Sequence, residues 1–465
     1  MKLELRDIAH WTGAELRVPS GDVAEQPATG YSIDTRTVKP GDLFFAVRGE
    51  RYDAHAFVPK AFEQGARAAV VSRNKAVEFL DLAHTHALLI VDDPLIALQT
   101  LATAVRRQWN KRVVGITGSA GKTTTKEAVA EVLSARFNVL RSHGNLNNEF
   151  GMPLQLLKLE PEHEIAVVEM GMSHSGEIAA LARIAHPDWG VVTNVGSAHA
   201  QNFPDGIAGI ARAKYELVQG LTSSGVAFLN CDDPYVAQFG RDFHGRSIYF
   251  GVGPCADPRA SDIEELGAEG VRFQVTAGEQ SATVTLALLG RHNVWNAMAA
   301  IATGFEAGIP LAECAAAAGR LQPPDKRGEV LHLGGATIIN DCYNSNPEAL
   351  KSMIAALATM AARRRILVAG EMLELGPEAG RLHEECGRVA AERGIDLVVG
   401  VRGNAQRIVD GAREAGALAI FVASPQEAGT WLKAELRAGD AVLLKASRGV
   451  GLEQALRILE QEPPR

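Results

Sequence analysis

The sequence predicts an α/β protein of three domains. Short apolar runs alternate with helical patterns between residues 112 and 310, as in a parallel sheet with helices on both faces. The same alternation returns between residues 321 and 465 and predicts a second doubly wound, Rossmann-like domain. A chain of 465 residues is also too long for a single hydrophobic core. We therefore expect domains at residues 1–88, 89–320 and 321–465.

Composition and charge exclude several classes of protein. The chain is 46% hydrophobic and 22% charged, as an ordinary globular protein is. A net charge of −8 without a dense Lys/Arg run makes nucleic acid an unexpected partner. The N-terminus, MKLELRDIAHW, lacks the apolar segment of a signal peptide, and no apolar run reaches the roughly 18 residues of a membrane span. We expect a cytoplasmic protein, without membrane insertion, that acts as a monomer.

The cysteines are few, odd in number and far apart. No C-x-x-C pair is present, so the spacing predicts neither a zinc site nor a disulfide framework. The cysteines are Cys231, Cys255, Cys314, Cys342 and Cys386.

The first domain contains a polar, turn-rich stretch. Pro40-Gly41-Asp42 signals a turn, and the LFFAV run after it predicts a strand. Asp34 and Arg36 lie in one loop-like stretch before this turn. There they either contact a polar ligand or form an ion pair at the surface, and the residues alone leave both interpretations open.

The central domain begins with a helix that starts at Asp92-Asp93-Pro94 and ends near Asn110. It leads into the strand RVVGIT and then into the small residues Gly118 to Gly121, which permit a tight loop whose amides converge on an anion. Lys122 adds a positive charge, Thr123 offers a hydroxyl to Mg²⁺, and the helical pattern that follows places the loop at a helix N-terminus. This stretch predicts a phosphate-binding loop (P-loop) for a nucleoside triphosphate, although Ile116 stands where the common motif has its first glycine.

Further polar residues follow other strands of this domain, where ligands of open α/β sheets bind. Glu169 ends the run IAVVE, and a carboxylate beside a phosphate loop suits Mg²⁺, although a helix-capping glutamate fits the position as well. His199 lies just past the run WGVVTNV, and the residues alone allow either a functional or a purely structural histidine. Lys214 lies in a helical pattern, and its chemistry alone does not distinguish it. Antiparallel strands near residues 271–289 are expected to flank the domain.

Candidate nucleotide contacts follow toward the third domain. Asn293 and Asn296 share one helical face, where their amides suit an adenine edge or, for Asn293, a helix cap. Arg327 lies on the connection between domains, where a guanidinium could close over a phosphate. Asp341 ends the strand ATIIND, a place suited to receive a ribose hydroxyl.

Several phrases, in this order along the whole chain, resemble one known family. They are TGSAGKTTTKE, EMG, TNVGSAH, AKYE, GRHNVWNAMAA and NDCYNSNP, and the chain is identified by them as similar to the Mur ligases of peptidoglycan synthesis. Three phrases resemble the branch of the family that adds D-alanyl-D-alanine to UDP-N-acetylmuramoyl-tripeptide. They are SIDTRTVKPGDLFFAVRGERYDAHAF, YNSNP and GEMLELGPEAGRLHEE.

The resemblance implies a role for each matching residue. ATP and Mg²⁺, with two ions expected, are the implied cofactors, and Lys214 matches a lysine that the family carries as a carbamate. The implied catalytic residues are Lys122, Glu169, His199 and Lys214. The implied metal ligands are Thr123, Glu169, His199 and Lys214. The implied ATP-binding residues are Gly118, Ser119, Ala120, Gly121, Lys122, Thr123, Thr124, Asn293, Asn296, Arg327, Asp341 and Tyr343. The implied substrate-binding residues are Ser32, Asp34, Thr35, Arg36, Asn145, Asn147, Asn148, Asn344 and Asn346.

The implied reaction is ATP-dependent amide formation through an acyl phosphate, in cytoplasmic synthesis of peptidoglycan precursors. The acyl phosphate must be kept from water, so we expect the third domain to close over the central one. The alternatives are a sister ligase that adds a single amino acid, a folate-polyglutamate ligase of similar fold, and a nucleotide-dependent switch that binds a protein partner. The sequence departs from the family pattern at Ser345, Glu371, Pro204-Asp205 and Ala446-Ser447-Arg448, which concerns finer substrate contacts.

Overall fold

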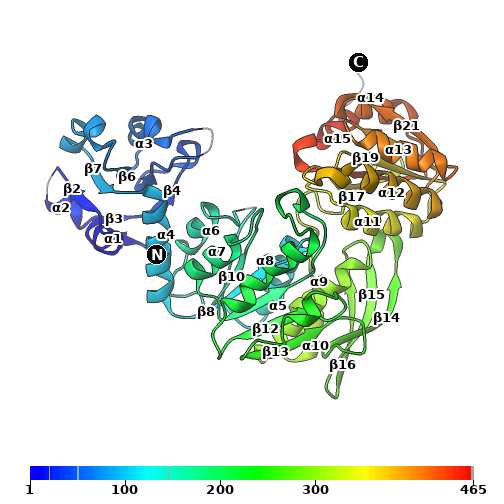
Figure 1. Ribbon diagram of the computed structural model, residues 1–465, viewed down its shortest axis with the longest axis horizontal. Coiled ribbons are helices and arrows are strands. Elements are labelled where there is room, and N and C mark those ends of the chain that lie inside the picture. The colour runs from blue at the N-terminus through cyan, green and yellow to red at the C-terminus, as the bar shows by residue number, and fades with distance from the viewer. Residues whose placement is uncertain (20, 50–51, 145, 462–465) are drawn as a thin grey trace.

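The computed structural model describes residues 1–19, 21–49, 52–144 and 146–461. The chain folds into globular parts that follow one another along the long axis of the molecule (Figure 1). We call residues 1–91 the first section, 92–320 the central section and 321–461 the third section. The first and third sections lie at opposite ends, with the central section between them (Figure 1).

The first section is built on a sheet of strand order β2-β7-β6-β5-β4, in which β2 runs antiparallel to β7 and the other neighbours are parallel. A small pair, β1 and β3, lies beside it. The elements are β1 (Leu3–Glu4), α1 (Leu5–Thr12), β2 (Glu15–Arg17), α2 (Gly21–Ala24), β3 (Pro27–Ala28), β4 (Gly30–Ser32), β5 (Asp42–Phe45), α3 (Val58–Glu63), β6 (Ala68–Ser72) and β7 (Ala87–Val91).

The central section carries the parallel sheet that the sequence predicts, of order β13-β12-β11-β8-β10-β9. Its flank is the predicted antiparallel sheet, of order β14-β15-β16. The elements are α4 (Pro94–Trp109), β8 (Arg112–Thr117), α5 (Lys122–Leu133), β9 (Val139–Arg141), α6 (Gly151–Leu156), β10 (Ile165–Glu169), α7 (Glu177–Ala185), β11 (Trp189–Val192), α8 (Ile207–Gln219), β12 (Val226–Asn230), β13 (Arg246–Phe250), β14 (Arg259–Glu265), β15 (Val271–Ala277), β16 (Gln280–Leu286), α9 (His292–Glu306) and α10 (Leu311–Ala318).

Helices cover both faces of the central sheet because successive side chains of a strand point to opposite faces. In β8, Val113 packs with the core of α4, α6, α7 and α8, whereas Val114 and Ile116 pack with that of α5, α9 and α10. Helix α4 begins where predicted, since the Asp93 carboxylate accepts hydrogen bonds from the Leu95 and Ile96 amides and Pro94 occupies the first turn. Its buried face joins the core of the first section to that of the central section.

The third section is a doubly wound domain with a sheet of order β17-β18-β22-β19-β20-β21. Its strands are parallel except β17, which runs antiparallel to β18 at the edge of the sheet. The sequence analysis did not predict β17. The elements are β17 (Glu329–Leu333), β18 (Ala336–Asp341), α11 (Pro347–Thr359), β19 (Arg364–Gly370), α12 (Ala379–Glu392), β20 (Leu397–Val401), α13 (Ala405–Glu414), β21 (Leu418–Val422), α14 (Pro425–Glu435), β22 (Asp440–Lys445) and α15 (Glu453–Glu460). Short 3₁₀ helices lie at Thr35–Thr37, Ala54–Phe57, Ala76–Phe79, Leu82–His84, Ala200–Asn202, Val236–Gln238, Gly267–Glu269, Gly376–Glu378 and Arg448–Val450.

Two expectations change in detail. The boundary expected after residue 88 falls inside β7 (Ala87–Val91), so the end of that strand is a better place for it. The expectation of no disulfide is wrong, because Cys231 and Cys255 are bonded, with their Cα atoms 6.0 Å apart. Local spacing could not reveal the pair, since Cys231 follows β12 and Cys255 follows β13, and these strands are neighbours only in the sheet. Within the described ranges, no helix combines the length and the apolar character needed to cross a membrane.

Candidate active site

A cavity of about 1240 Å³ lies between the central and third sections. Among the residues that the structure describes, none from the first section lines it. The predicted site residues that do line it are Ser119, Ala120, Gly121, Lys122, Thr123, Thr124, Asn147, Asn148, Glu169, His199, Asn293, Asn296, Arg327, Asp341, Tyr343, Asn344 and Asn346. The fold therefore brings residues that are more than 200 positions apart into one site.

The P-loop connects β8 to α5 at the carboxyl edge of the sheet. Its glycines are required by space: a Cβ at Gly118 would lie 1.8 Å from Thr193 Oγ1, and one at Gly121, whose φ is 79°, would lie 2.5 Å from Asn296 Oδ1. The Lys122 ammonium donates to the Gly118 carbonyl at 2.8 Å. Burial lowers the pKa of Lys122; the Glu169 carboxylate opposes this and Arg327 adds to it.

A second loop, which follows β11, supports the P-loop. The Ala120 amide donates to Asn194 Oδ1 at 2.8 Å, and the Thr193 hydroxyl donates to the Ala120 carbonyl at 2.7 Å. The sequence analysis singled out the phrase TNVGSAH for His199 but did not select Thr193 or Asn194. Their contacts with the P-loop depend on the fold, which places the loop after β11 beside the P-loop.

Glu169 ends β10 as predicted and is almost fully buried. Its two carboxylate oxygens accept hydrogen bonds from the Thr123 hydroxyl and from the Asn147 amide group, each at 2.8 Å. Glu169 is therefore not a helix cap in this structure. Thr123, Glu169 and Asn147 instead form a cluster of oxygen-bearing groups beside the P-loop, which is the ligand chemistry that Mg²⁺ requires.

His199 lies in a left-handed backbone conformation, with φ of 64°, just before the 3₁₀ helix Ala200–Asn202. Its Nδ1 is 2.5 Å from the Oε2 atom of Glu374, a residue of the third section. Burial lowers the pKa of His199, and the Glu374 carboxylate opposes that effect. The loop after β11 is thus in contact with both the P-loop and the third section.

Lys214 points away from solvent on α8 and is only 2% exposed, in contrast to the exposed helical lysine that its pattern suggests. Among the described residues, its ammonium has no hydrogen-bond or ion-pair partner. Burial holds the pKa of Lys214 well below its ordinary value, and the nearby charge of Lys122 lowers it further. Lys214 does not line the cavity itself, and neither does Gly118.

Asn293 and Asn296 lie together near the start of α9, and both are buried. Asn296 donates to Asn293 Oδ1 at 2.8 Å and accepts from the Thr125 hydroxyl at 3.0 Å, while Asn293 donates to the Leu289 carbonyl at 2.7 Å. Neither is a helix cap, since the helix begins at His292. Their amides link α9 to α5 behind the P-loop and leave few hydrogen-bonding atoms free for a base.

The third section contributes a cationic wall. Arg327 stacks on the Tyr343 ring, with its Cζ 4.0 Å from the ring centroid. The Lys445 ammonium donates to Asp341 Oδ2 at 2.5 Å and to the Asn344 carbonyl at 3.0 Å, a contact that the sequence analysis missed. The partly buried His292 lies near this pair, and desolvation lowers its pKa to about 4.

Two of the predicted substrate residues of this region instead support local backbone. Asn346 caps α11 by accepting from the Ala349 amide at 2.8 Å, and Asn344 Oδ1 accepts from the Ser345 amide at 2.9 Å. Asn148 likewise accepts from the Gly151 amide at 2.9 Å, beside α6. Asn145 lies outside the described residues.

The predicted loop of the first section is remote from the cavity. Asp34 accepts from the backbone amide of Arg36 at 2.9 Å and forms an ion pair with its guanidinium, which is 85% exposed. The Ser32 hydroxyl donates to the Asp34 carbonyl at 2.9 Å, and Thr35 begins the short 3₁₀ helix. The surface ion pair that the residues left open is therefore present, and the loop is closed on itself.

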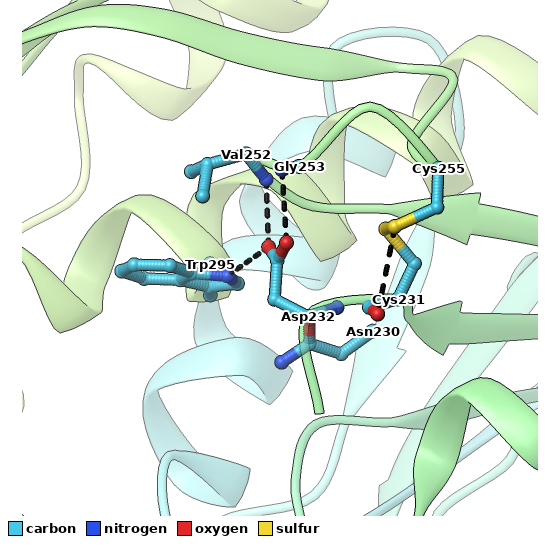
Figure 2. Close-up of a disulfide and its surroundings, with 7 residues drawn as sticks. All are labelled: Asn230, Cys231, Asp232, Val252, Gly253, Cys255 and Trp295. Atoms are coloured by element: carbon cyan, nitrogen blue, oxygen red, sulfur yellow. Dashed lines mark hydrogen bonds between the residues drawn. A yellow bond between two sulfur atoms is a disulfide. The ribbon is translucent and has the colours of Figure 1, made fainter. Parts of the chain in front are cut away.

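Neither cysteine of the disulfide lines the cavity, although Asn230, the residue before Cys231, does. Figure 2 shows the disulfide with its neighbours. Asp232, beside Cys231, accepts from the Val252 and Gly253 amides at 2.7 and 2.8 Å and from the Trp295 indole at 2.6 Å (Figure 2). Asn230, Phe250 and Trp295 line the cavity. The disulfide thus joins the segments that follow β12 and β13, and Asp232 connects them to Trp295 in the first turn of α9.

Comparisons with known proteins agree with this geometry. Family models match the chain as the Mur ligase middle domain at residues 116–304, the Mur ligase, glutamate ligase domain at residues 326–448, and the Mur ligase family, catalytic domain at residues 27–143. The UDP-N-acetylmuramoyl-tripeptide–D-alanyl-D-alanine ligase of Bacillus subtilis is 36% identical, over 100% of this chain and 99% of that relative.

Solved structures extend the likeness to the fold. A crystal structure of MurF from Acinetobacter baumannii has a TM-score of 0.87 and 28% identity, and covers 99% of each chain. The MurF ligase of Thermotoga maritima in complex with ADP has a TM-score of 0.81 and 29% identity, over 93% of this chain and 97% of that one.

Proposed function

The chain belongs to the Mur ligase family, and on that premise we propose that it joins D-alanyl-D-alanine to UDP-N-acetylmuramoyl-tripeptide in an ATP-dependent reaction of peptidoglycan precursor synthesis. The observation that carries this proposal is the cavity in which the P-loop of the central section faces the cationic wall of the third section. The Bacillus subtilis relative, which is similar to this chain over 99% of its length, carries the name of the ligase for that reaction.

The chemistry requires activation of a carboxylate, because a carboxylate is a poor electrophile. We propose that the terminal carboxylate of the tripeptide attacks the γ-phosphorus of ATP and forms an acyl phosphate, with ADP as the leaving group. The amine of D-alanyl-D-alanine then attacks the acyl carbon, and the resulting tetrahedral intermediate expels phosphate as the amide forms. The amine loses one proton in this step. Since an acyl phosphate hydrolyses in water, the site must be enclosed while it exists.

Lys122 and Arg327 are the groups best placed to hold the ATP phosphates. They come from different sections, yet the charge of Arg327 is near enough to lower the pKa of Lys122. Two cations that repel each other across a cavity are stabilised when an anion lies between them. Backbone amides at the N-terminus of α5 add further positive potential, and Gly118 to Thr124 provide the loop.

The residues beside the P-loop fit Mg²⁺. Thr123 and Glu169 present oxygen atoms that already lie 2.8 Å apart, and His199 lies on the neighbouring loop. We propose that these residues, with Lys214, hold two ions. Bound there, Mg²⁺ would neutralise charge on the transferring phosphoryl group.

A free ammonium at Lys214 would repel Mg²⁺, so we propose that Lys214 is carbamylated. Its burial and depressed pKa favour the neutral amine, which is the form that adds to CO₂. The addition forms an N–C bond, releases one proton from the neutral amine and gives an N-carboxylated side chain with a negative charge. Carbon-13 NMR of enzyme equilibrated with labelled CO₂ should show one carbamate signal that is absent from Lys214→Ala. Absence of the signal at saturating CO₂ would exclude the modification.

The remaining site residues divide between nucleotide and substrates. We propose that Asp341 receives the ribose of ATP, with Tyr343 beside it, and that Asn293 and Asn296 shape the purine side. Asn147, Asn148, Asn344 and Asn346 would face the muramoyl-peptide, and Asn145 would do so with them. Ser32, Asp34, Thr35 and Arg36 would bind the uridine diphosphate. Because that loop is remote from the cavity, the substrate must span the distance or the first section must move.

The proposal extends to the protein's organisation. Residues 1–88, with the boundary adjusted to the end of β7, would bind the UDP-substrate, 89–320 would bind ATP, and 321–465 would close over both substrates. We propose that the protein is monomeric and acts in the cytoplasm, where its nucleotide substrates are made.

The test is ADP release from ATP in the presence of UDP-N-acetylmuramoyl-tripeptide, with and without D-alanyl-D-alanine and with single amino acids as controls. Turnover only with the dipeptide is the expected result. Turnover with a single amino acid would instead indicate a sister activity, and stimulation by a protein alone would indicate a nucleotide switch.

A further inference from the structure

One loop of the central section contacts both the P-loop and the third section. We call it the bridging loop and define it as Asn194–His199, between β11 and the 3₁₀ helix Ala200–Asn202. It carries His199, but its other residues were not selected by the sequence analysis. Its contacts indicate how the position of the third section could affect the conformation of the P-loop.

On one side, the bridging loop is bonded to the P-loop. The Gly196 amide donates to Ser119 Oγ at 2.8 Å, and the Ser119 hydroxyl donates back to the Gly196 carbonyl at 3.2 Å. Asn194 adds the bond from the Ala120 amide at 2.8 Å. A displacement of Gly196 would therefore displace Ser119, whose backbone belongs to the loop that receives the phosphates.

On the other side, the bridging loop is bonded to Glu348 of the third section. Glu348 Oε1 accepts from the Ser197 hydroxyl at 2.9 Å and from the Ser197 amide at 3.3 Å. Gly196 is close as well, since a Cβ built there would lie 3.3 Å from Glu348 Cδ. Glu348 is the second residue of α11, where the helix dipole stabilises its negative charge.

The partners of Glu348 distinguish it from other carboxylates of this section. Glu378, Glu384 and Glu385 pair with lysine or arginine side chains of their own section. Glu348 forms no ion pair with any described residue, and the hydrogen bonds that the structure shows for its carboxylate all come from Ser197. Hydrogen bonds to a charged group are stronger than those between neutral groups, and although Glu348 is exposed, its partner Ser197 is buried, so the contact fixes the bridging loop against the start of α11.

We propose that Glu348 is a positioning residue for ATP, which acts through Ser197 and Gly196 on Ser119 of the P-loop. When the third section closes on the central one, the Glu348 carboxylate holds the bridging loop, and the bridging loop holds the P-loop in its phosphate-binding form. Glu348 itself need not touch the nucleotide. The kinetic test of this inference, by ADP release, rests on the proposed function. The binding test, by affinity for an ATP analogue, does not.

The test compares Glu348→Ala, Glu348→Gln, Ser197→Ala and the double variant Glu348→Ala/Ser197→Ala with wild-type protein. Affinity for a non-hydrolysable ATP analogue is measured by titration calorimetry without peptide substrates, and kcat and KM are measured by ADP release. Glu384→Gln, which removes a carboxylate from an exposed ion pair on α12, is the matched control.

We expect Glu348→Ala to lower kcat/KM for ATP by about 10- to 100-fold, the range for loss of a hydrogen bond to a charged group, with KM for D-alanyl-D-alanine changed less than about twofold. Glu348→Gln keeps an acceptor oxygen and should lose less. The double variant should be no worse than Glu348→Ala alone, because both substitutions break the same connection. Glu384→Gln should match wild type.

Additive effects of the two substitutions would overturn the proposal, as would wild-type analogue affinity in Glu348→Ala or an equal rise in KM for both substrates. A failure of the proposed function is recognised separately: wild-type protein would then release no ADP with the dipeptide, while the calorimetric comparison of analogue affinity would still decide the role of Glu348.

Discussion

The P-loop of the central section and the Ser32–Arg36 loop of the first section are both polar loops, but they are built differently. Gly118 and Gly121 are packed against Thr193 and Asn296, and the P-loop is bonded to a neighbouring loop. In the first section, Asp34 is bonded to Arg36 of the same loop, and the guanidinium is exposed. The nucleotide side is thus assembled from distant residues, whereas the loop of the first section is held by its own neighbours.

This difference indicates which of the two loops is already arranged to bind a ligand. A site held by contacts between several elements is rigid before the ligand arrives, and its groups are already oriented. If the Ser32–Arg36 loop binds a ligand, as we propose, it must exchange the ion pair between Asp34 and Arg36 for that ligand, which weakens binding. The predictions below test the contrast from the largest expected effect to the smallest.

Lys122→Ala should produce the largest effect on activity. The substitution removes the positive charge from the P-loop, and we expect kcat/KM to fall by roughly 10²- to 10³-fold, as when a transition state loses one preorganised electrostatic contact. Thermal stability should be unchanged or higher, because Lys122 is a partly buried cation near Arg327. ADP release and calorimetric unfolding measure both quantities. The control is Lys433→Ala on α14. A stable Lys122→Ala enzyme with nearly normal turnover would contradict the view that the P-loop is already arranged to bind ATP.

The disulfide should produce the largest effect on stability, and the third section should be unaffected. It closes a loop with a sequence separation of 24 residues, for which chain entropy predicts up to about 3.5 kcal/mol of stabilisation. We expect Cys231→Ser or a reducing agent to lower the unfolding temperature of the central section, while the third section, whose cysteines are free thiols in separate hydrophobic cores, unfolds as before.

Cys386→Ala, which removes a buried free thiol in the third section, is the control for the cysteine substitution. Urea unfolding followed by limited proteolysis assigns each transition to a section. Equal sensitivity of the third section to reduction would show that the effect of the disulfide is not confined to the core that contains it.

Arg36→Ala should separate binding from stability in the first section. We expect KM for UDP-N-acetylmuramoyl-tripeptide to rise about tenfold, the effect of one lost charge-assisted hydrogen bond, with KM for ATP unchanged. The ion pair with Asp34 is exposed, so its loss should leave the unfolding temperature of the section unchanged. Arg17→Ala, which removes another exposed ion pair of the same section, is the matched control. Parallel changes in both KM values would indicate that this loop does not bind the UDP-substrate.

The smallest effect should be a pH dependence in the interior of the third section, at the buried His383 of α12. His383 Nε2 accepts from the Met372 amide at 2.8 Å, which requires the neutral ring. Burial lowers the pKa of His383, so the folded state binds this proton less readily than the unfolded state. The stabilisation is therefore complete above the ordinary histidine pKa of about 6.5, and it is lost as the pH falls below that value through the folded-state pKa.

We expect the third section to unfold at lower temperature at pH 5.5 than at pH 7.5, and His383→Ala to reduce this difference. The control is His332→Ala, at an exposed position of β17. If the difference in unfolding temperature between pH 5.5 and pH 7.5 is unchanged in His383→Ala, other titratable groups cause it.

The sequence predicted well where a site is a continuous stretch. The P-loop, the strand end at Glu169 and the alternation of strands and helices all appear in short windows of sequence, because strand, loop and helix follow one another directly. It predicted poorly where a contact joins distant stretches. Lys445 beside Asp341, Glu374 beside His199 and the Cys231–Cys255 bond leave no local pattern, since each partner alone is an ordinary residue of its type.

The sequence by itself determined the α/β class, the P-loop and the family, because hydrophobic period, turn residues and motif spacing are local properties of the chain. Only the tertiary structure decided which polar residues meet. It placed the cavity between the central and third sections and left Ser32–Arg36 outside it. It also buried Lys214, which has no hydrogen-bond or ion-pair partner among the described residues, and connected Glu348 through Ser197 to the P-loop. The physical reason is that burial, pKa shifts and contacts between sections depend on distances that only packing defines.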